Sequence, residues 1–169
     1  MENIILLIST GVFALFLVAL WFVVKNPETG SSFGIQDSVS ATYKLLLALL
    51  PKAAQSVWIL LFFILAVGII ATGQNAWYFG SAVGLCGVGA FPEYWERDSV
   101  KKHISAAYLA YLVPMVYMLF FDGRVFTTVL AAAWLVFAAL CSFNVVQLKY
   151  RTTIYELAGF MAIAIGLSL

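Results

Sequence analysis

Six long apolar segments alternate with short polar stretches along this chain. A helix needs about 20 apolar residues to cross a bilayer, and fewer where the bilayer thins locally. The pattern therefore predicts an all-α fold, a polytopic transmembrane helical bundle of about six short spans in a single domain over residues 1–169. The predicted spans are residues 4–24, 53–72, 77–91, 104–121, 125–148 and 154–169.

The stretch between the first two spans follows a different pattern. Residues 26–32 are rich in turn-forming types, and from Asp37 the spacing becomes helical. One side of this helix carries apolar residues, at Val39, Tyr43, Leu46, Leu47 and Leu50, and another side carries Asp37, Ser40 and Lys44. We expect an interfacial helix over residues 37–50 that lies on the membrane and turns at Pro51 into the second span. The alternative is that residues 45–50 simply extend the second span.

The composition supports a lipid environment. Apolar residues make up 64% of the chain and charged residues only 10%, whereas soluble domains carry about 25% charged residues. The net charge of +1 and the scattered basic residues exclude a basic face for nucleic acid. Cys86 and Cys141 both lie in apolar runs and lack the spacing of a metal site or a disulfide framework, so we expect packing roles for them.

The basic residues predict the orientation. Of the nine Lys and Arg residues, all but Arg124 fall in the loops after spans one, three and five. Cytoplasmic loops carry the excess of basic residues, so these three loops are expected in the cytoplasm. The protein is then expected in a bacterial inner membrane as a multi-pass protein, with both termini in the periplasm.

Acidic and polar residues gather at the predicted cytoplasmic face. Ionisable groups at membrane depth are costly, so they are candidates for function. The candidate ligand-binding residues come from three different loops or span ends: Asp37, Ser40, Tyr43, Glu93, His103 and Glu156.

Two kinds of chemistry would use such a cluster. Carboxylates with a histidine can hold a divalent metal that activates water, or Glu93 and His103 can act as a proton-transfer pair. His103, Glu93 and Glu156 are thus the candidates for catalysis. Because the chain has a single histidine, we expect no metal and no cofactor. The structural alternative is that Thr153 and Glu156 form a capping box at the start of the last span.

The third and fourth spans carry packing signals. Gly80, Gly84 and Gly87 recur at helical spacing, a small-residue pattern that lets helices approach closely. This face is expected to pack within the chain, to form a homo-oligomer seam, or to line a groove of ligand size. Pro114 lies inside the fourth span and predicts a kink there, with a carbonyl freed by its missing N–H.

Three short motifs carry a family resemblance: Ser38-Val-Ser-Ala-Thr-Tyr43, Gly87-Val-Gly-Ala-Phe-Pro92 and His103-Ile-Ser-Ala-Ala107. In this order they resemble a broad group of small six-span bacterial inner-membrane proteins whose function is not established. The group shares the elements Ser-x-Ser-x-x-Tyr, Gly-x-x-x-Phe-Pro and His-x-x-Ala-Ala. The resemblance implies a helical bundle with its polar elements clustered at one face. The layout is more loosely similar to alkaline ceramidase-type hydrolases, whose three zinc-binding histidines are represented here by His103 alone.

The sequence favours a non-enzymatic protein that binds a membrane lipid or a small apolar ligand between its helices. The alternatives are a membrane-embedded hydrolase, which would use the same polar cluster, and a small transporter or channel. The transporter ranks last because the first, second and fifth spans offer few polar residues to line a water-filled path.

Overall fold

The structure is a computed structural model that describes residues 2–24, 38–72, 75–93, 95–143, 145–146 and 150–168. Asp37 lies outside the described residues. The described chain is helical throughout, and the elements follow in the order α1 (Glu2–Val23), the 3₁₀ helix η1 (Ser40–Thr42), α2 (Tyr43–Leu49), α3 (Ala54–Ile70), α4 (Ala76–Ala90), α5 (Arg97–Phe120), α6 (Val125–Ser142) and α7 (Arg151–Ser168).

The six predicted spans correspond to the six long helices, and their ends differ most in α5 and α6. α5 begins at Arg97, well before residue 104, so its first turns are polar. α6 ends at Ser142 instead of residue 148, because the N–H groups of Val145 and Val146 turn back onto the Leu140 carbonyl at 2.9 and 3.3 Å. The apolar composition of a segment predicts which residues lipid can surround, whereas the ends of a helix depend on backbone hydrogen bonds. In α5 and α6 the ends of the apolar segment and of the helix differ.

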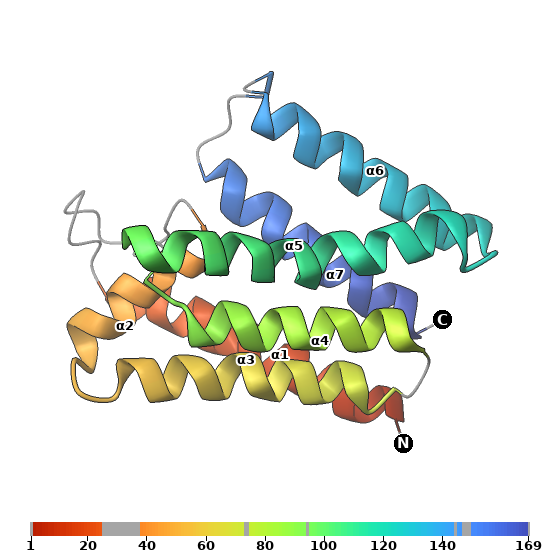
Figure 1. Ribbon diagram of the computed structural model, residues 1–169. Helices are drawn as coiled ribbons and strands as arrows, with labels where there is room; N and C mark the ends of the chain where they lie inside the picture. Colours follow the sequence, from red (N-terminus) through yellow and green to blue (C-terminus); the bar gives the residue numbers. More distant parts are fainter. Residues whose placement is uncertain are drawn as a thin grey trace.

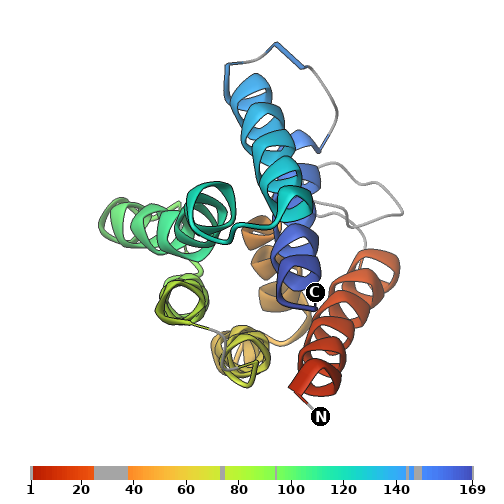
Figure 2. The same ribbon diagram turned by 90° about the vertical axis from the view of Figure 1, so that its right-hand side faces the viewer.

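The long helices alternate in direction, so that α1 begins and α7 ends at the same end of the bundle (Figure 1). Consecutive contacts join α1 to α3, α3 to α4 and α4 to α5. α7 contacts α1, α5 and α6, and it lies near the centre when the bundle is viewed from its end (Figure 2). α6 lies at one edge of the bundle, where it contacts α5 and α7 (Figure 1).

The segment before α3 forms a separate short helix within residues 37–50 and does not extend α3, whereas its expected place on the membrane surface stays a prediction. α2 ends at Leu49 because the residue before Pro51 is disfavoured in helical conformation. Tyr43, Leu45 and Leu46 are buried against the bundle. Trp21 of α1 donates from Nε1 to Thr42 Oγ1 at 3.1 Å, which ties the segment to the first helix.

α4 and α5 pack at close range through the glycine face. A Cβ atom added to Gly84 would lie 2.3 Å from the Ala110 backbone nitrogen, so only glycine fits there. The same face includes Gly80 and Gly87, whose added Cβ atoms would meet side chains of α5. The close approach is therefore intramolecular, the first of the three expected roles.

Pro114 is accommodated within α5. The helix continues through this residue, and the missing N–H leaves the carbonyl of Ala110 without its helical donor. Ser81 of α4 supplies the donor, since its Oγ lies 2.6 Å from the Ala110 oxygen. The freed carbonyl predicted from the proline is thus satisfied by the neighbouring helix.

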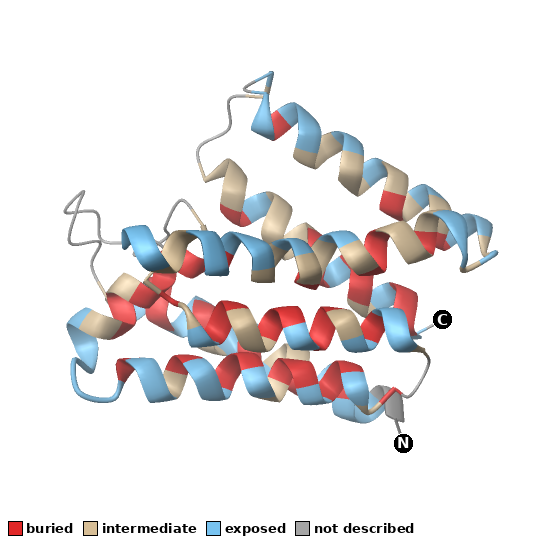
Figure 3. Ribbon diagram, viewed as in Figure 1, coloured by how far each residue is buried: buried red, intermediate tan, exposed pale blue. Residues whose placement is uncertain are grey.

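Among the residues that the structure describes, three helices are long and apolar enough to cross a membrane: residues Ile4–Val23, Arg97–Phe120 and Val125–Ser142. α3 and α4 are also apolar but shorter, with 17 and 15 residues. At 1.5 Å per residue α3 is about 25 Å long, against about 30 Å of hydrocarbon. Many large apolar side chains are exposed, such as those of Leu7, Leu15 and Val125. Figure 3 shows exposed residues along every long helix and buried residues where α3 and α4 face each other. This surface is that of a membrane protein.

Candidate ligand-binding site

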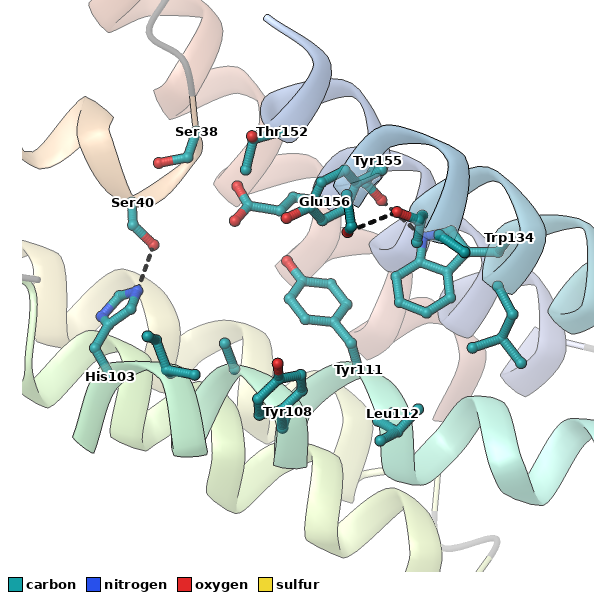
Figure 4. Close-up of a pocket in the computed structure, with 16 residues that line it drawn as sticks. Ser38, Ser40, His103, Tyr108, Tyr111, Leu112, Trp134, Thr152, Tyr155 and Glu156 are labelled. Carbon is teal, nitrogen blue, oxygen red and sulfur yellow. Dashed lines mark hydrogen bonds between the residues drawn. The ribbon is translucent and has the colours of Figure 1, made fainter. Parts of the chain in front are cut away.

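A pocket of about 640 Å³ lies between α5, α6 and the first turns of α7, and residues Ser38 and Ser40 close one end (Figure 4). Most of its wall is apolar, whereas one end is polar. The lining residues are Ser38, Ser40, His103, Ile104, Ala107, Tyr108, Tyr111, Leu112, Trp134, Leu135, Ala138, Ala139, Ser142, Thr152, Tyr155 and Glu156.

Helical periodicity explains how α5 contributes its wall. Two rows of lining residues run along one side of the helix, each with a four-residue spacing, which keeps them on one face. The first row is His103, Ala107 and Tyr111, and the second is Ile104, Tyr108 and Leu112. The face therefore grades from an imidazole at the helix start to apolar and aromatic side chains deeper in the bundle.

His103 is held between a hydroxyl and a carbonyl. Its Nδ1 lies 2.7 Å from the Phe91 carbonyl oxygen, and its Nε2 lies 3.0 Å from Ser40 Oγ. A carbonyl only accepts hydrogen bonds, so Nδ1 carries the proton, and in the neutral ring Nε2 accepts from the Ser40 hydroxyl. His103 and Ser40 are both buried, with 7% and 5% of their surface exposed. The Gly-x-x-x-Phe-Pro and His-x-x-Ala-Ala motifs thus meet at one imidazole.

Glu156 reaches across to the segment before η1. Its Oε2 accepts a hydrogen bond of 2.6 Å from the Val39 backbone N–H. α7 begins at Arg151, so Thr153 lies inside the helix, and the alternative interpretation of Thr153 and Glu156 as a capping box is wrong. The carboxylate instead links two distant parts of the chain and lines the polar end of the pocket.

Aromatic rings form the wall between the polar end and the apolar part. Tyr111 stacks on Trp134 with centroids 5.9 Å apart, and Trp134 Nε1 donates to the Tyr155 carbonyl at 2.7 Å. Gly159 of α7 makes room for this pair, because a Cβ there would lie 2.8 Å from Tyr111 Cδ1 and 2.9 Å from Trp134 Nε1.

Two other predicted residues, Tyr43 and Glu93, do not line the pocket. Tyr43 is buried at 3% exposure and packs against Trp58 and Trp95, so it is absent from the lining, as is Glu93. Burial raises the pKa of the Tyr43 hydroxyl, and the negative charge of Glu93 raises it further. Ser40, His103 and Glu156 thus line one pocket, whose lining includes neither Tyr43 nor Glu93.

Two further expectations concern the glycines and a metal. The face of Gly80, Gly84 and Gly87 is covered by α5 and does not line the pocket. The pocket lies on another side of α5, where this helix faces α6 and α7. Within the described part of the chain, no group of three or more His, Cys, Asp and Glu residues is placed to hold a metal ion.

The lining residues that the sequence did not single out include four aromatic ones: Tyr108, Tyr111, Trp134 and Tyr155. Their signal is the spacing of Tyr108 and Tyr111 behind His103, which places hydroxyl-bearing rings on the same helical face as the imidazole. Comparison of the chain with family models, with curated proteins and with solved structures finds no match.

Proposed function

We propose that this protein binds a lipid or another amphiphile in the pocket between α5, α6 and α7. The observation that carries the proposal is the division of this pocket into an apolar wall and a polar end. Its volume of about 640 Å³ falls within the range of about 300–1,000 Å³ that is usual for ligand sites. An amphiphile has the same two parts as the pocket, a chain that is excluded from water and a head group that needs hydrogen bonds.

The position of the pocket supports a ligand taken from the bilayer. α6 bounds the pocket, and its other side exposes large apolar residues, among them Val129 and Val136. A ligand beside such a helix lies within the apolar layer. The bundle would then sit in a bacterial inner membrane with six crossings and both termini periplasmic.

The distribution of charge supports this orientation. Helices that start or end at the polar end of the pocket carry nearly all the described basic residues, and Arg124 lies at the opposite end of the bundle. The basic residues at the pocket end are Lys44, Lys52, Arg97, Lys101, Lys102 and Arg151. Under the positive-inside rule this end faces the cytoplasm.

The proposal is tested by filling the pocket. Ala138→Trp places an indole in the lining, whereas Ala133→Trp on the same helix adds the same ring to an exposed position outside the lining. Native mass spectrometry of the detergent-purified protein measures co-purifying lipid. We expect retained lipid in the wild type and in Ala133→Trp and its loss in Ala138→Trp. Equal retention in both variants would remove the pocket as the binding site.

A second candidate function, a membrane-embedded hydrolase, is favoured by the hydrogen bond between Ser40 and His103. A serine hydroxyl bound to a neutral imidazole whose other nitrogen is fixed is the arrangement of an activated nucleophile. Ser40 Oγ would attack an ester carbonyl carbon while Nε2 takes its proton, and the imidazolium would then protonate the departing alkoxide. Water, deprotonated in turn by Nε2, would release the acid and restore the serine.

A fluorophosphonate probe distinguishes this candidate from simple binding, because it labels serines that act as nucleophiles. Labelling of the wild type at Ser40, lost in Ser40→Ala and in His103→Ala, would support the hydrolase. Absence of labelling on folded protein would leave Ser40 as a hydrogen-bonding residue of the pocket.

A further inference from the structure

We propose that the head group recognised in this pocket is a cation, an ammonium or quaternary ammonium group on an apolar chain. This inference rests on the proposed function, since it assigns the ligand class of the same pocket. It is drawn from the charges and rings that line the polar end.

The ionisable groups of the lining are unbalanced. Glu156 supplies a carboxylate, and among the lining residues that the structure describes none is Lys or Arg. The imidazole of His103 is satisfied as a neutral ring by the Phe91 carbonyl and the Ser40 hydroxyl. An anionic head group would therefore meet a carboxylate without a basic side chain to offset it.

In its ionised form Glu156 would need a positive partner. Within the described chain its carboxylate accepts one hydrogen bond, from the Val39 N–H, and forms no ion pair. A carboxylate removed from water is costly unless a cation or several hydrogen bonds compensate it. A bound ammonium group beside Glu156 would supply that compensation.

The aromatic rings of the same lining favour the same class of ligand. Tyr108, Tyr111, Trp134 and Tyr155 all line the pocket, and ring faces attract cations most strongly where water is excluded. Figure 4 shows Glu156, Ser40 and His103 toward one side of the pocket, with Tyr111 between them and Leu112. A cationic head at Glu156 thus leaves its chain against the apolar part of α5 and α6.

The test compares single-chain amphiphiles that differ only in head group: decyltrimethylammonium, neutral decyl glycerol ether and decyl phosphate. Binding to protein in a neutral maltoside detergent is measured by native mass spectrometry and by the rise in Tm that a ligand of the folded state produces. We expect decyltrimethylammonium to bind most tightly and decyl phosphate least. Equal binding of all three would overturn the inference.

Glu156→Gln probes the charge, and Glu96→Gln removes an exposed carboxylate near the same end as its control. We expect Glu156→Gln to weaken decyltrimethylammonium about tenfold, equivalent to about 1.4 kcal/mol, and Glu96→Gln to leave it unchanged. If Glu156→Gln does not fold, the head-group order on the wild type still decides. Tetramethylammonium competing as strongly as the decyl compound would overturn the amphiphile as the ligand and point to a small free cation.

Failure of this inference can be told apart from failure of the proposed function by Ala138→Trp. If all three amphiphiles bind equally to the wild type and none binds to Ala138→Trp, the pocket binds amphiphiles without a preference for the charge of the head group. If Ala138→Trp binds them as the wild type does, the pocket itself is not the site.

Discussion

Arg124 binds both carboxylate oxygens of Asp122, with Nε 2.8 Å from Oδ2 and Nη2 2.9 Å from Oδ1. Nη2 also donates to the Gly166 carbonyl at 2.9 Å, and Thr127 donates from Oγ1 to Asp122. The turn between α5 and α6 is thereby attached to the last turn of α7, at the end of the bundle opposite the pocket.

This cluster predicts a loss of stability in acid. Burial alone raises the pKa of Asp122, but the hydrogen bonds from Arg124 and Thr127 and the charge of Arg124 outweigh it and hold the pKa below the usual value. A lowered folded-state pKa stabilises the protein above the unfolded pKa of about 4, and this stabilisation is lost as the pH falls through the folded value. Tm of the detergent-purified protein should therefore fall steeply below about pH 4.

Two variants separate Asp122 from acid sensitivity in general. Asp122→Asn should be less stable at neutral pH and should lose less stability on acidification than the wild type does. Asp98→Asn, which changes an exposed carboxylate in the first turn of α5, should follow the wild-type profile. Parallel profiles for Asp122→Asn and the wild type would contradict the role of Asp122.

The glycine face predicts a contrast between two chemically identical substitutions. In Gly84→Ala the new methyl would meet backbone atoms of Ala106 and Ala110 that cannot move without separating α4 from α5. We expect a loss of about 1–3 kcal/mol or more, as for overpacked cores. In Gly80→Ala the methyl would lie 3.3 Å from Val113 Cγ1, a side-chain atom that can shift, so the change should stay within about 1 kcal/mol. Thermal unfolding in detergent measures both, and equal effects would mean that the helices are not in close contact at Gly84.

His103→Ala tests the link between the three segments that meet at the imidazole. The variant leaves the Ser40 hydroxyl and the Phe91 carbonyl without this partner in a buried setting, which costs about 1–3 kcal/mol. Lys101→Ala changes an exposed residue just before His103 on the same helix, and it should change the free energy of unfolding by no more than about 0.5 kcal/mol. The measurement is the midpoint of thermal unfolding, and similar midpoints for both variants would place His103 outside the packed structure.

The proposed orientation predicts which end of the bundle a reagent reaches. In a protein whose Cys86 and Cys141 are replaced by alanine, single cysteines are introduced by Lys52→Cys at the pocket end and Val125→Cys at the opposite end. A membrane-impermeant maleimide applied to cells with a permeabilised outer membrane should label Val125→Cys at once and Lys52→Cys only after lysis. The reverse order would invert the orientation.

The helices were predictable because long apolar runs have few other solutions in lipid. The ends of the helices were less predictable. The hydrogen bonds from the Val145 and Val146 N–H groups to the Leu140 carbonyl end α6 inside an apolar segment that was predicted to continue to residue 148. The all-α bundle and the short helix before Pro51 follow from local patterns, whereas these ends depend on individual hydrogen bonds.

The site was only partly predictable, for a geometric reason. Ser40, His103 and Glu156 could be grouped because the predicted topology places their segments at one face of the membrane. Sequence does not say which side of α5 faces α6, so the aromatic wall of Tyr111 and Trp134 was missed. For the same reason the glycine face was considered as a groove, although the backbone of Ala110 covers Gly84.

The hydrogen bond from Ser81 to the Ala110 carbonyl has a consequence for the order of assembly. The ribosome synthesises α4 before Pro114. The Ser81 hydroxyl that donates to the Ala110 carbonyl is therefore already present when Pro114 leaves this carbonyl without its helical donor. The Ala110 carbonyl therefore needs no hydrogen-bond donor from a later part of the chain, and α4 and α5 can enter the bilayer together as a helical hairpin.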